Sequence, residues 1–502
     1  MTKTKQYKLR LSIAALIPML FVAPGKLWAA DSGATILELF VDQDTKQIYA
    51  EPGPNRVKMG DFVPASGNGG NAVDYAEYEQ RLEAKQQAYE KKLDEMLAKA
   101  PRDEDEVKVK LGKKGLELES QDGNFSMRLG GRMHADATFH EGDDNLVERG
   151  TTTPVEATDG TEIRRGRIAL SGTLYKDFDY VIESDFGGDR VSVKDLFVNY
   201  TGFEPFELTA GHQKHAVSME IQESSNDIMF TERSLVSALT LPFFDRAIGV
   251  NLKSSGKNWS IQGGLYGDSM GSSGNGADEG SGWGARATFA PVNTSSSVVH
   301  LGASVGQRKA NANNDLANSK DARLRYRTTN MSDFSLTDTG DIAGFDDVSL
   351  LGLEAAAMYG PWSIQSEYAR SKVARDTGTD LDFDAFYVQM GWTLTGESRT
   401  YKGSDGEFKR LKPKHDFSLA KGTWGAWELA ARYDQVDLND ADIFGGEQKR
   451  ATLALNWYLN ENVRLMADYS RSFDLDNSPV TKANGEEPDD IDVFWLRTQW
   501  AF

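Results

Sequence analysis

The sequence contains no cysteine and very little histidine. None of its 502 residues is a cysteine, and six are histidines. The absence of cysteine excludes disulfide scaffolds, Cys-ligated zinc or iron–sulfur sites and thiol nucleophiles. The histidines stand in no recognisable Ser/His/Asp or zinc-binding motif: they are His134, His140, His212, His215, His300 and His415. An enzyme such as a lipase or protease is therefore a weak hypothesis, and no catalytic residue, metal or cofactor is expected.

Basic residues are outnumbered, and long apolar runs are missing. The chain has 56 Lys and Arg residues against 76 Asp and Glu residues, a formal net charge of -20. A nucleic-acid-binding module would show a basic footprint, so no nucleic-acid partner is expected. The mean hydropathy is -0.50, and beyond the N-terminus no apolar run approaches the ~20 residues of a membrane helix. A membrane β-barrel stays possible, because its strands alternate apolar and polar residues.

The N-terminus has the plan of a secretory signal. Several basic residues precede the apolar run 11–23, and small residues stand just before Asp31. The apolar run is too short to span a bilayer, so we predict a signal peptide over residues 1–30. Residues 31–70 are predicted to form an N-terminal extension that ends in a flexible Gly/Asn-rich linker.

Residues 71–101 are predicted to form a periplasmic, coiled-coil-like helix. The stretch is rich in Ala, Glu, Lys, Gln and Leu, and Pro101 closes it. Four apolar residues recur every seven positions: Tyr75, Leu82, Tyr89 and Met96. Because Lys85 and Lys92 fall on what would be the second apolar seam, an oligomeric coiled coil and a single amphipathic or solvated helix both stay open.

From Asn124 to the C-terminus, apolar and polar residues alternate with a period of two. In residues 125–136, one face carries Phe, Met, Leu, Met and Ala, and the other carries Ser, Arg, Arg, His and Asp. The run 494–502 behaves in the same way. Further runs, which bring the total to sixteen, begin near residues 161, 178, 192, 206, 246, 258, 281, 297, 348, 362, 382, 425, 449 and 462.

The connections between these runs differ in length in a regular way. Tight turns such as 175–177 and 255–257 alternate with long polar segments. The long segments are approximately 140–160, 213–245, 268–280, 308–347, 436–448 and 473–490. Two connections depart from this rule, since the third is short and the twelfth, at about 395–424, is long. Long loops on one side and short turns on the other are typical of outer-membrane barrels.

These patterns predict an all-β fold, a sixteen-stranded antiparallel transmembrane β-barrel over residues 112–502. A soluble β-sandwich or propeller would also alternate, but it explains less well the aromatic residues at the strand ends of the apolar face. An aromatic girdle requires them there. They are Tyr359, Trp362, Trp392, Trp457, Tyr458, Trp500 and Phe502.

If the apolar face meets lipid, the polar face lines a lumen that carries many basic side chains. Strand parity or position places six of them there: Arg128, Arg132, Arg165, Arg167, Lys194 and Lys214. Arg164 has the opposite parity to Arg165, so it would need a bulge or a position near the strand end to reach the lumen.

Three arginines at period two stand in the long ninth connection: Arg323, Arg325 and Arg327. In an extended chain their guanidinium groups project from one side, about 6.6–6.8 Å apart. Guanidinium groups match the oxygens of phosphate, sulfate or carboxylate. A row of similar sites lets an anion move on without being trapped. A solvated basic stretch on a loop is the equally open alternative.

At these residues the sequence resembles the phosphate-selective porin O and P family of bacterial outer-membrane channels. The resemblance runs with interruptions from about Leu116 to Phe502. Its motifs are residues 125–132 (FSMRLGGR), 164–167 (RRGR), 193–198 (VKDLFV), 210–214 (AGHQK), 231–233 (TER), 323–327 (RLRYR), 394–397 (LTGE) and 425–429 (GAWEL).

The resemblance implies a homotrimer of sixteen-stranded barrels in the outer membrane of a Gram-negative bacterium. It also implies a ladder of arginines that leads anions to a constriction, formed partly by the third long loop folding inward. By motif position, Arg323, Arg325 and Arg327 correspond to the ladder, and Arg164 and Arg165 to the constriction pair. Arg132 corresponds to a basic residue further along the pore, and Ser224 and Ser225 to hydroxyls that assist phosphate binding.

The chain departs from the family pattern at the constriction. Arg167 and Lys214 stand where phosphate-selective members have aromatic residues. Lys194 replaces a carboxylate, and Ile221 replaces a lysine. These changes are expected to preserve a preference for anions and to leave open which one is preferred.

The function expected from the sequence is passive, anion-favouring diffusion of small inorganic or organic anions such as phosphate or polyphosphate. A general, weakly selective porin and a plugged structural or adhesive barrel are the alternatives. The acidic loops 140–160, 436–448 and 473–490 predict an outer surface where divalent cations bridge to lipopolysaccharide.

Overall fold

The computed structural model describes residues 37–42, 48–53, 55–62, 84–85, 88, 91–92, 107–142, 145–267, 279–309 and 322–502. The predicted signal peptide and the predicted Gly/Asn-rich linker lie outside these residues. The chain divides into two compact units, Met1–Asp74 and Tyr75–Phe502. No helix among the described residues is long and apolar enough to cross a membrane.

The first unit contains a small antiparallel sheet where the sequence predicted only an extension. Its strands are β1 (Leu37–Asp42), β2 (Ile48–Tyr49) and β3 (Arg56–Phe62), in the order β2-β1-β3. The guanidinium group of Arg56 lies 3.4 Å from the centre of the Tyr49 ring. In the second unit, five residues of the predicted coiled-coil-like helix are described, and all are helical: Ala84, Lys85, Ala88, Lys91 and Lys92.

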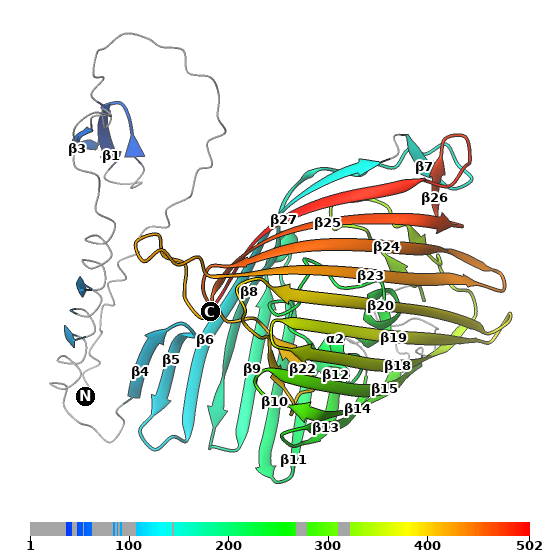
Figure 1. Ribbon diagram of the computed structural model, residues 1–502, viewed down its shortest axis with the longest axis horizontal. Coiled ribbons are helices and arrows are strands. Elements are labelled where there is room, and N and C mark those ends of the chain that lie inside the picture. Colours follow the sequence, from blue (N-terminus) through cyan, green and yellow to red (C-terminus); the bar gives the residue numbers. More distant parts are fainter. Residues whose placement is uncertain are drawn as a thin grey trace, which may run out of the picture. The chain divides into compact units, whose positions relative to one another are not determined.

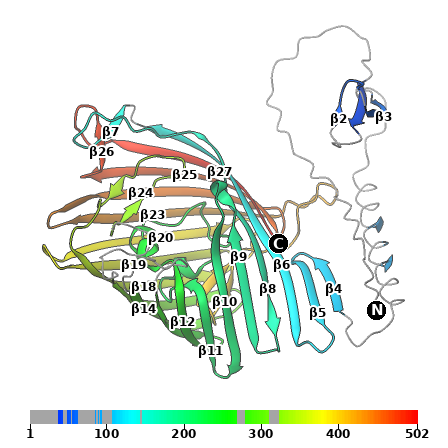
Figure 2. The ribbon, with the colours of Figure 1, turned by 180° about the vertical axis from the view of Figure 1, so that it is seen from behind.

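The predicted barrel is confirmed: sixteen antiparallel strands close through the pairing of the last strand with the first (Figures 1 and 2). In chain order they are β6 (Phe125–Gly142), β8 (Gly160–Leu174), β9 (Phe178–Asp185), β10 (Ser192–Phe203), β11 (Phe206–Lys214), β12 (Arg246–Ser255), β13 (Trp259–Tyr266), β14 (Ser281–Asn293), β15 (Ser297–Lys309), β18 (Phe345–Tyr359), β19 (Trp362–Arg375), β20 (Leu381–Thr393), β23 (Ala426–Asp440), β24 (Ile443–Tyr458), β25 (Val463–Asp476) and β27 (Asp490–Ala501). A hairpin of β4 (Val107–Gly112) and β5 (Gly115–Ser120) extends the sheet beside β6.

The period-two alternation separates an outer apolar face from an inner polar one, as the sequence predicted. On β20, Val388, Met390 and Trp392 are 40%, 50% and 40% exposed, whereas Gln389 between them is 4% exposed. Stacked aromatic pairs stand on the outer face near the short turns, among them Trp362 with Trp392. The prediction that Tyr458 belongs to this girdle is wrong. Its ring is buried, because its hydroxyl donates to Glu428 inside the barrel, at 2.8 Å.

The connections follow the predicted alternation with one correction. Residues 436–448, predicted to be a long loop, continue strands β23 and β24, which meet at a turn around Ala441. Val436 and Leu438 are fully buried on the inner face, so the alternation extends beyond the acidic residues that suggested a loop. Ala441 adopts a positive φ of 49°, as tight two-residue hairpin turns require.

Two connections fold into the lumen from opposite ends of the barrel. Residues 215–245, between β11 and β12, carry α2 (Met219–Gln222) and α3 (Ser237–Phe244). Residues 394–425, the twelfth connection, carry β21 (Thr400–Lys402) and β22 (Glu407–Lys409), which we call the inner hairpin. The third loop of the long-loop end, residues 215–245, thus folds inward as the family resemblance implied.

An apolar cluster inside the barrel fixes residues 215–245 and 322–344 to the wall. Side chains from both segments pack on the inner face of β18, β19, β20 and β23. Its largest members are Leu239, Phe243, Phe244, Leu324, Tyr326, Phe345, Phe383 and Tyr387. Burial of this apolar surface holds the two segments against one side of the wall.

Leu453 on β24 offers a test of the outer face. It is 61% exposed, and its neighbours Thr452 and Ala454 are buried. We expect Leu453→Lys to destabilise the folded barrel in lipid by about 2–4 kcal/mol, because it places a charge near the middle of the apolar band. Leu419→Lys, at a 63% exposed position of the loop 394–425, is the control. Equal unfolding free energies for the two variants in urea titrations would contradict the assigned lipid face.

Candidate functional site: a basic cavity inside the barrel

The three ladder residues Arg323, Arg325 and Arg327 project from one side of an extended segment. The short strand β16 (Arg325–Tyr326) pairs with β17 (Thr337–Asp338). Leu324 and Tyr326 are buried against the wall, whereas Arg325 and Arg327 are exposed. The period-two spacing therefore sorts apolar and basic side chains to opposite sides, as the sequence predicted for an extended segment.

Tyr326 holds this segment in place. Its hydroxyl donates to the carbonyl oxygen of Arg233 at 3.1 Å and accepts from Arg450 Nη1 at 2.7 Å. Arg450 is itself paired with Asp434 on the inner wall. The ladder segment is thus fixed by a polar network that does not use the ladder guanidinium groups.

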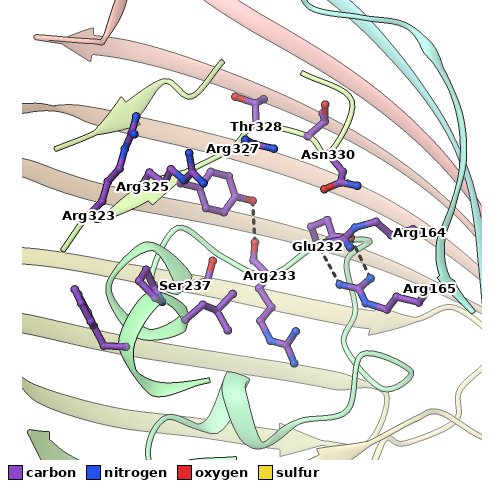
Figure 3. A pocket seen from close by; sticks show the side chains of 15 residues that line it. Arg164, Arg165, Glu232, Arg233, Ser237, Arg323, Arg325, Arg327, Thr328 and Asn330 are labelled. Atoms are coloured by element: carbon purple, nitrogen blue, oxygen red, sulfur yellow. Dashed lines mark hydrogen bonds and ion pairs between the residues drawn. The ribbon is translucent and has the colours of Figure 1, made fainter. Parts of the chain in front are cut away.

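The ladder residues and the predicted constriction pair, Arg164 and Arg165, line a single cavity of about 720 Å³, which we call the ladder cavity. Figure 3 shows Arg323, Arg325 and Arg327 following one another toward Arg164 and Arg165. The cavity is lined by Arg164, Arg165, Glu232, Arg233, Ser237, Leu241, Pro242, Phe243, Arg323, Arg325, Tyr326, Arg327, Thr328, Thr329 and Asn330. Residues as far apart in the sequence as Arg164 and Asn330 thus share one basic cavity.

Charge is unevenly compensated in this cavity. Arg323 is paired with Asp338 at 2.5 Å. Within the described residues, Arg325 and Arg327 have no ion-pair partner. Arg233 donates to the carbonyl oxygens of Glu220 and Glu223, each at 3.0 Å, and no described carboxylate forms an ion pair with it. The ladder side of the cavity therefore carries an excess of positive charge.

Arg164 reaches the lumen through a bulge, as its parity required. In the pairing of β6 with β8, His134 lies opposite Arg165 and Ala135 opposite Ile163, so Arg164 is the extra residue. Both arginines of the constriction pair contact the carboxylate of Glu232. Burial opposes ionisation of Glu232, but the nearby guanidinium groups outweigh it and hold its pKa well below the usual range.

Arg128 and Arg132 line a second cavity, of about 260 Å³, together with Arg410 and Lys412 of the loop 394–425. Arg132 donates to Ser224 Oγ at 3.1 Å and to Ser225 Oγ at 3.2 Å. It also forms an ion pair with Glu183 at 2.7 Å. The two predicted hydroxyls therefore stand beside the basic residue predicted further along the pore.

The remaining predicted residues line neither of these cavities. Arg167 is paired with Glu183 at 2.9 Å and with Asp185 at 2.7 Å. Lys214 donates to the carbonyl oxygens of Gln222 and Glu223, at 2.9 and 3.3 Å, and so supports the end of α2. Lys194 lies in an irregular part of β10, where the pairing with β9 shifts register. Ile221 is buried in the apolar cluster.

Sequence reasoning gave no role to several residues that line these cavities, among them Arg233, Glu232 and Arg410. Arg233 and Glu232 belong to the Thr231-Glu232-Arg233 motif. The motif contributed to the family resemblance, but it assigned no function to either residue. Strand parity could not find them, because they lie on connections inside the barrel. In the described part of the chain, no group of three His, Asp or Glu side chains is placed to hold a metal ion.

Comparison with known proteins identifies the family. Residues 127–502 match the family described as "Phosphate-selective porin O and P". The chain belongs to this family. It is therefore a β-barrel porin of the outer membrane, from a family of anion-selective channels, and its fold and family point to a channel rather than an enzyme.

Two curated relatives and two solved structures illustrate the range of similarity. Porin O of Pseudomonas aeruginosa is 29% identical over 431 residues, which cover 78% of this chain and 91% of the relative. An uncharacterized protein of Caulobacter vibrioides is 32% identical over 396 residues, covering 76% and 75%. An anion-selective porin from Comamonas acidovorans has a TM-score of 0.48 at 13% identity, covering 75% of this chain and 100% of that one. The trimer form of OmpT from Vibrio cholerae has a TM-score of 0.45 at 12% identity, covering 75% and 99%.

Proposed function

We propose that this porin passes small oxyanions along an arginine-lined path through the barrel. The observation that carries the proposal is the composition of the ladder cavity, whose lining includes six arginines and a single carboxylate. The path runs from Arg323, Arg325 and Arg327 past the constriction pair. It continues to Arg132, with Ser224 and Ser225, and to Arg128.

The chemistry of these groups favours phosphate-like anions over chloride. A guanidinium group offers forked N–H donors that match two oxygens of one anion. Arg325 and Arg327 are exposed in the cavity, so they are available to make such contacts. The hydroxyls of Ser224 and Ser225, which lie beside Arg132, add O–H donors for a tetrahedral anion.

Reversal potentials test the anion preference. The purified protein is reconstituted in planar bilayers under a KCl gradient, and we expect a reversal potential of the sign that marks anion selectivity. A cation-selective sign would contradict the proposal, and a potential near zero would favour a general porin. Inhibition of the chloride current by phosphate, pyrophosphate, sulfate and succinate then ranks the anions. Folded protein without conductance would instead favour a plugged barrel.

The assembly and its surroundings belong to the same proposal. Membership in the porin family supports a homotrimer, with one pore in each barrel. The N-terminal segment then lies in the periplasm. The acidic segments 140–160 and 473–490 at the loop end face lipopolysaccharide, where bridging divalent cations screen their charge.

A further inference from the structure

Glu232 occupies the position at the constriction pair that a passing oxyanion would take. Its Oε1 accepts from Arg164 Nε at 3.0 Å, from Arg165 Nη1 at 3.1 Å and from Arg497 Nη2 at 3.0 Å. Its Oε2 accepts from Arg164 Nη2 at 3.3 Å and from Arg165 Nη2 at 3.1 Å. A carboxylate has about four lone-pair sites, so these five contacts occupy it fully. Figure 3 shows Glu232 between Arg164 and Arg165.

The constriction pair depends on Glu232 more than Arg497 does. Arg497 has a second carboxylate partner, Asp136, to which its Nε and Nη2 donate at 2.7 and 2.6 Å. Within the described residues, Arg164 and Arg165 form ion pairs with no carboxylate other than Glu232. Removal of the Glu232 charge would therefore leave two uncompensated guanidinium groups side by side at the cavity wall.

The backbone around Glu232 is held on both sides, so the carboxylate is tethered. Thr231 donates to Asp468 Oδ2 through its N–H at 2.7 Å and through its hydroxyl at 2.9 Å. The carbonyl oxygen of Glu232 accepts from Arg432 Nη1 at 3.1 Å. The Glu232 side chain is nevertheless 22% exposed, and it lines the ladder cavity. Arg164 and Arg165 line the same cavity, so an anion there can reach these two of the guanidinium groups that Glu232 contacts.

We propose that Glu232 is a tethered competing anion, which weakens the oxyanion site at Arg164 and Arg165 and so sets how tightly the pore holds what it passes. The inference rests on the proposed function. Two adjacent guanidinium groups in a confined cavity would bind an oxyanion through several charge-assisted hydrogen bonds. A single deep site slows conduction, because a bound ion must also leave. With Glu232 present, an arriving anion exchanges with a carboxylate of similar chemistry, and the carboxylate returns when the anion leaves.

The test compares Glu232→Gln with the wild-type protein by the inhibition of chloride current in planar bilayers by inorganic phosphate. We expect the half-inhibiting phosphate concentration to fall about tenfold or more, which corresponds to at least 1.4 kcal/mol of tighter binding. Glu232→Asp keeps the charge but shortens its reach, so a smaller fall is expected. An unchanged or higher half-inhibiting concentration in both variants would overturn the inference.

Glu162→Gln is the matched control. Glu162 lies on β8 close to the constriction pair, but its carboxylate accepts from Asn330 Nδ2, at 2.8 Å, instead of pairing with an arginine. The half-inhibiting concentration of this variant should stay near the wild-type value, and an equal fall would show that any nearby negative charge has the effect. The reversal potential of the wild-type protein separates the two hypotheses. If the wild-type protein shows no anion selectivity, the proposed function is rejected. If it is anion-selective but phosphate inhibition is unchanged in both Glu232 variants, only the role of Glu232 is rejected.

Discussion

The double substitution Arg325→Glu and Arg327→Glu is expected to abolish the anion preference of the pore at low salt. Each substitution changes the local charge by two units. At about 7 Å in a water-filled lumen, one unit charge contributes roughly 0.6 kcal/mol, so the double variant lowers the stabilisation of a monovalent anion by about 2.4 kcal/mol. This corresponds to roughly a fiftyfold fall in local anion concentration, which salt screening reduces. The measurement is the reversal potential under a KCl gradient at low ionic strength.

The structure predicts that these substitutions change charge without unfolding the ladder segment. Arg325 and Arg327 are exposed, and the segment is anchored instead through Tyr326. The neutral variant Arg325→Gln with Arg327→Gln should give about half the change in free energy. Its control is Arg370→Gln with Arg471→Gln. That pair removes the same charge from side chains that are 53% and 47% exposed and paired outside the cavities. If the control shifts the reversal potential as far as the ladder variant does, the ladder has no special role.

The substitution Arg286→Met is expected to release the inner hairpin and to raise the single-channel conductance severalfold. Arg286 is fully buried, and its Nε and Nη2 each donate to Glu354 at 2.8 Å. It also donates to the carbonyl oxygens of Asp405 and Gly406, at 3.0 and 2.7 Å. Gly406 adopts a φ of +65°, and a Cβ there would stand 2.5 Å from Thr288 Oγ1. The tip of the hairpin is thus pressed closely against β14.

Breaking this buried pair leaves Glu354 without its guanidinium partner. The loss of one partner from a buried ion pair costs about 3–5 kcal/mol, so the thermal unfolding midpoint should fall along with the rise in conductance. Arg370→Gln, which breaks an exposed pair worth about 0–1 kcal/mol, is the control for stability. Unchanged conductance and an unchanged midpoint in Arg286→Met would show that the hairpin is held by other contacts, such as the ion pair of Lys253 with Asp405 at 2.8 Å.

Side-chain alternation made the wall of the barrel predictable from the sequence. Each strand places successive residues on opposite faces, and one face meets lipid while the other meets polar groups, so the pattern is local. The same reasoning anticipated the bulge at Arg164 and the common side of Arg323, Arg325 and Arg327. It failed at residues 436–448, because the acidic residues at these strand ends have a composition typical of a loop. It also failed at Tyr458. The hydrogen bond of its hydroxyl inside the barrel overrides the usual preference of tyrosine for the membrane interface.

The filling of the lumen was decided only by the tertiary structure. The sequence marked the connections 213–245 and 395–424 by their length, and family resemblance implied that one loop folds inward. The insertion of the inner hairpin, however, depends on Arg286 of one strand and Glu354 of another. Some arginines are likewise paired with carboxylates far away in the sequence, as Arg497 is with Asp136, 361 positions apart.

The sequence by itself therefore determined the barrel, its outer face and the identity of most basic residues of the lumen, because apolar and polar residues alternate with a period of two in each strand. Only the tertiary structure decided which of those charges stay free for an anion. Among the described residues, Arg325, Arg327 and Arg233 have no carboxylate partner in the ladder cavity, while Arg164 and Arg165 share Glu232. The physical reason is that ion pairing depends on distances of a few ångströms between segments far apart in the chain, and no local spacing encodes these distances.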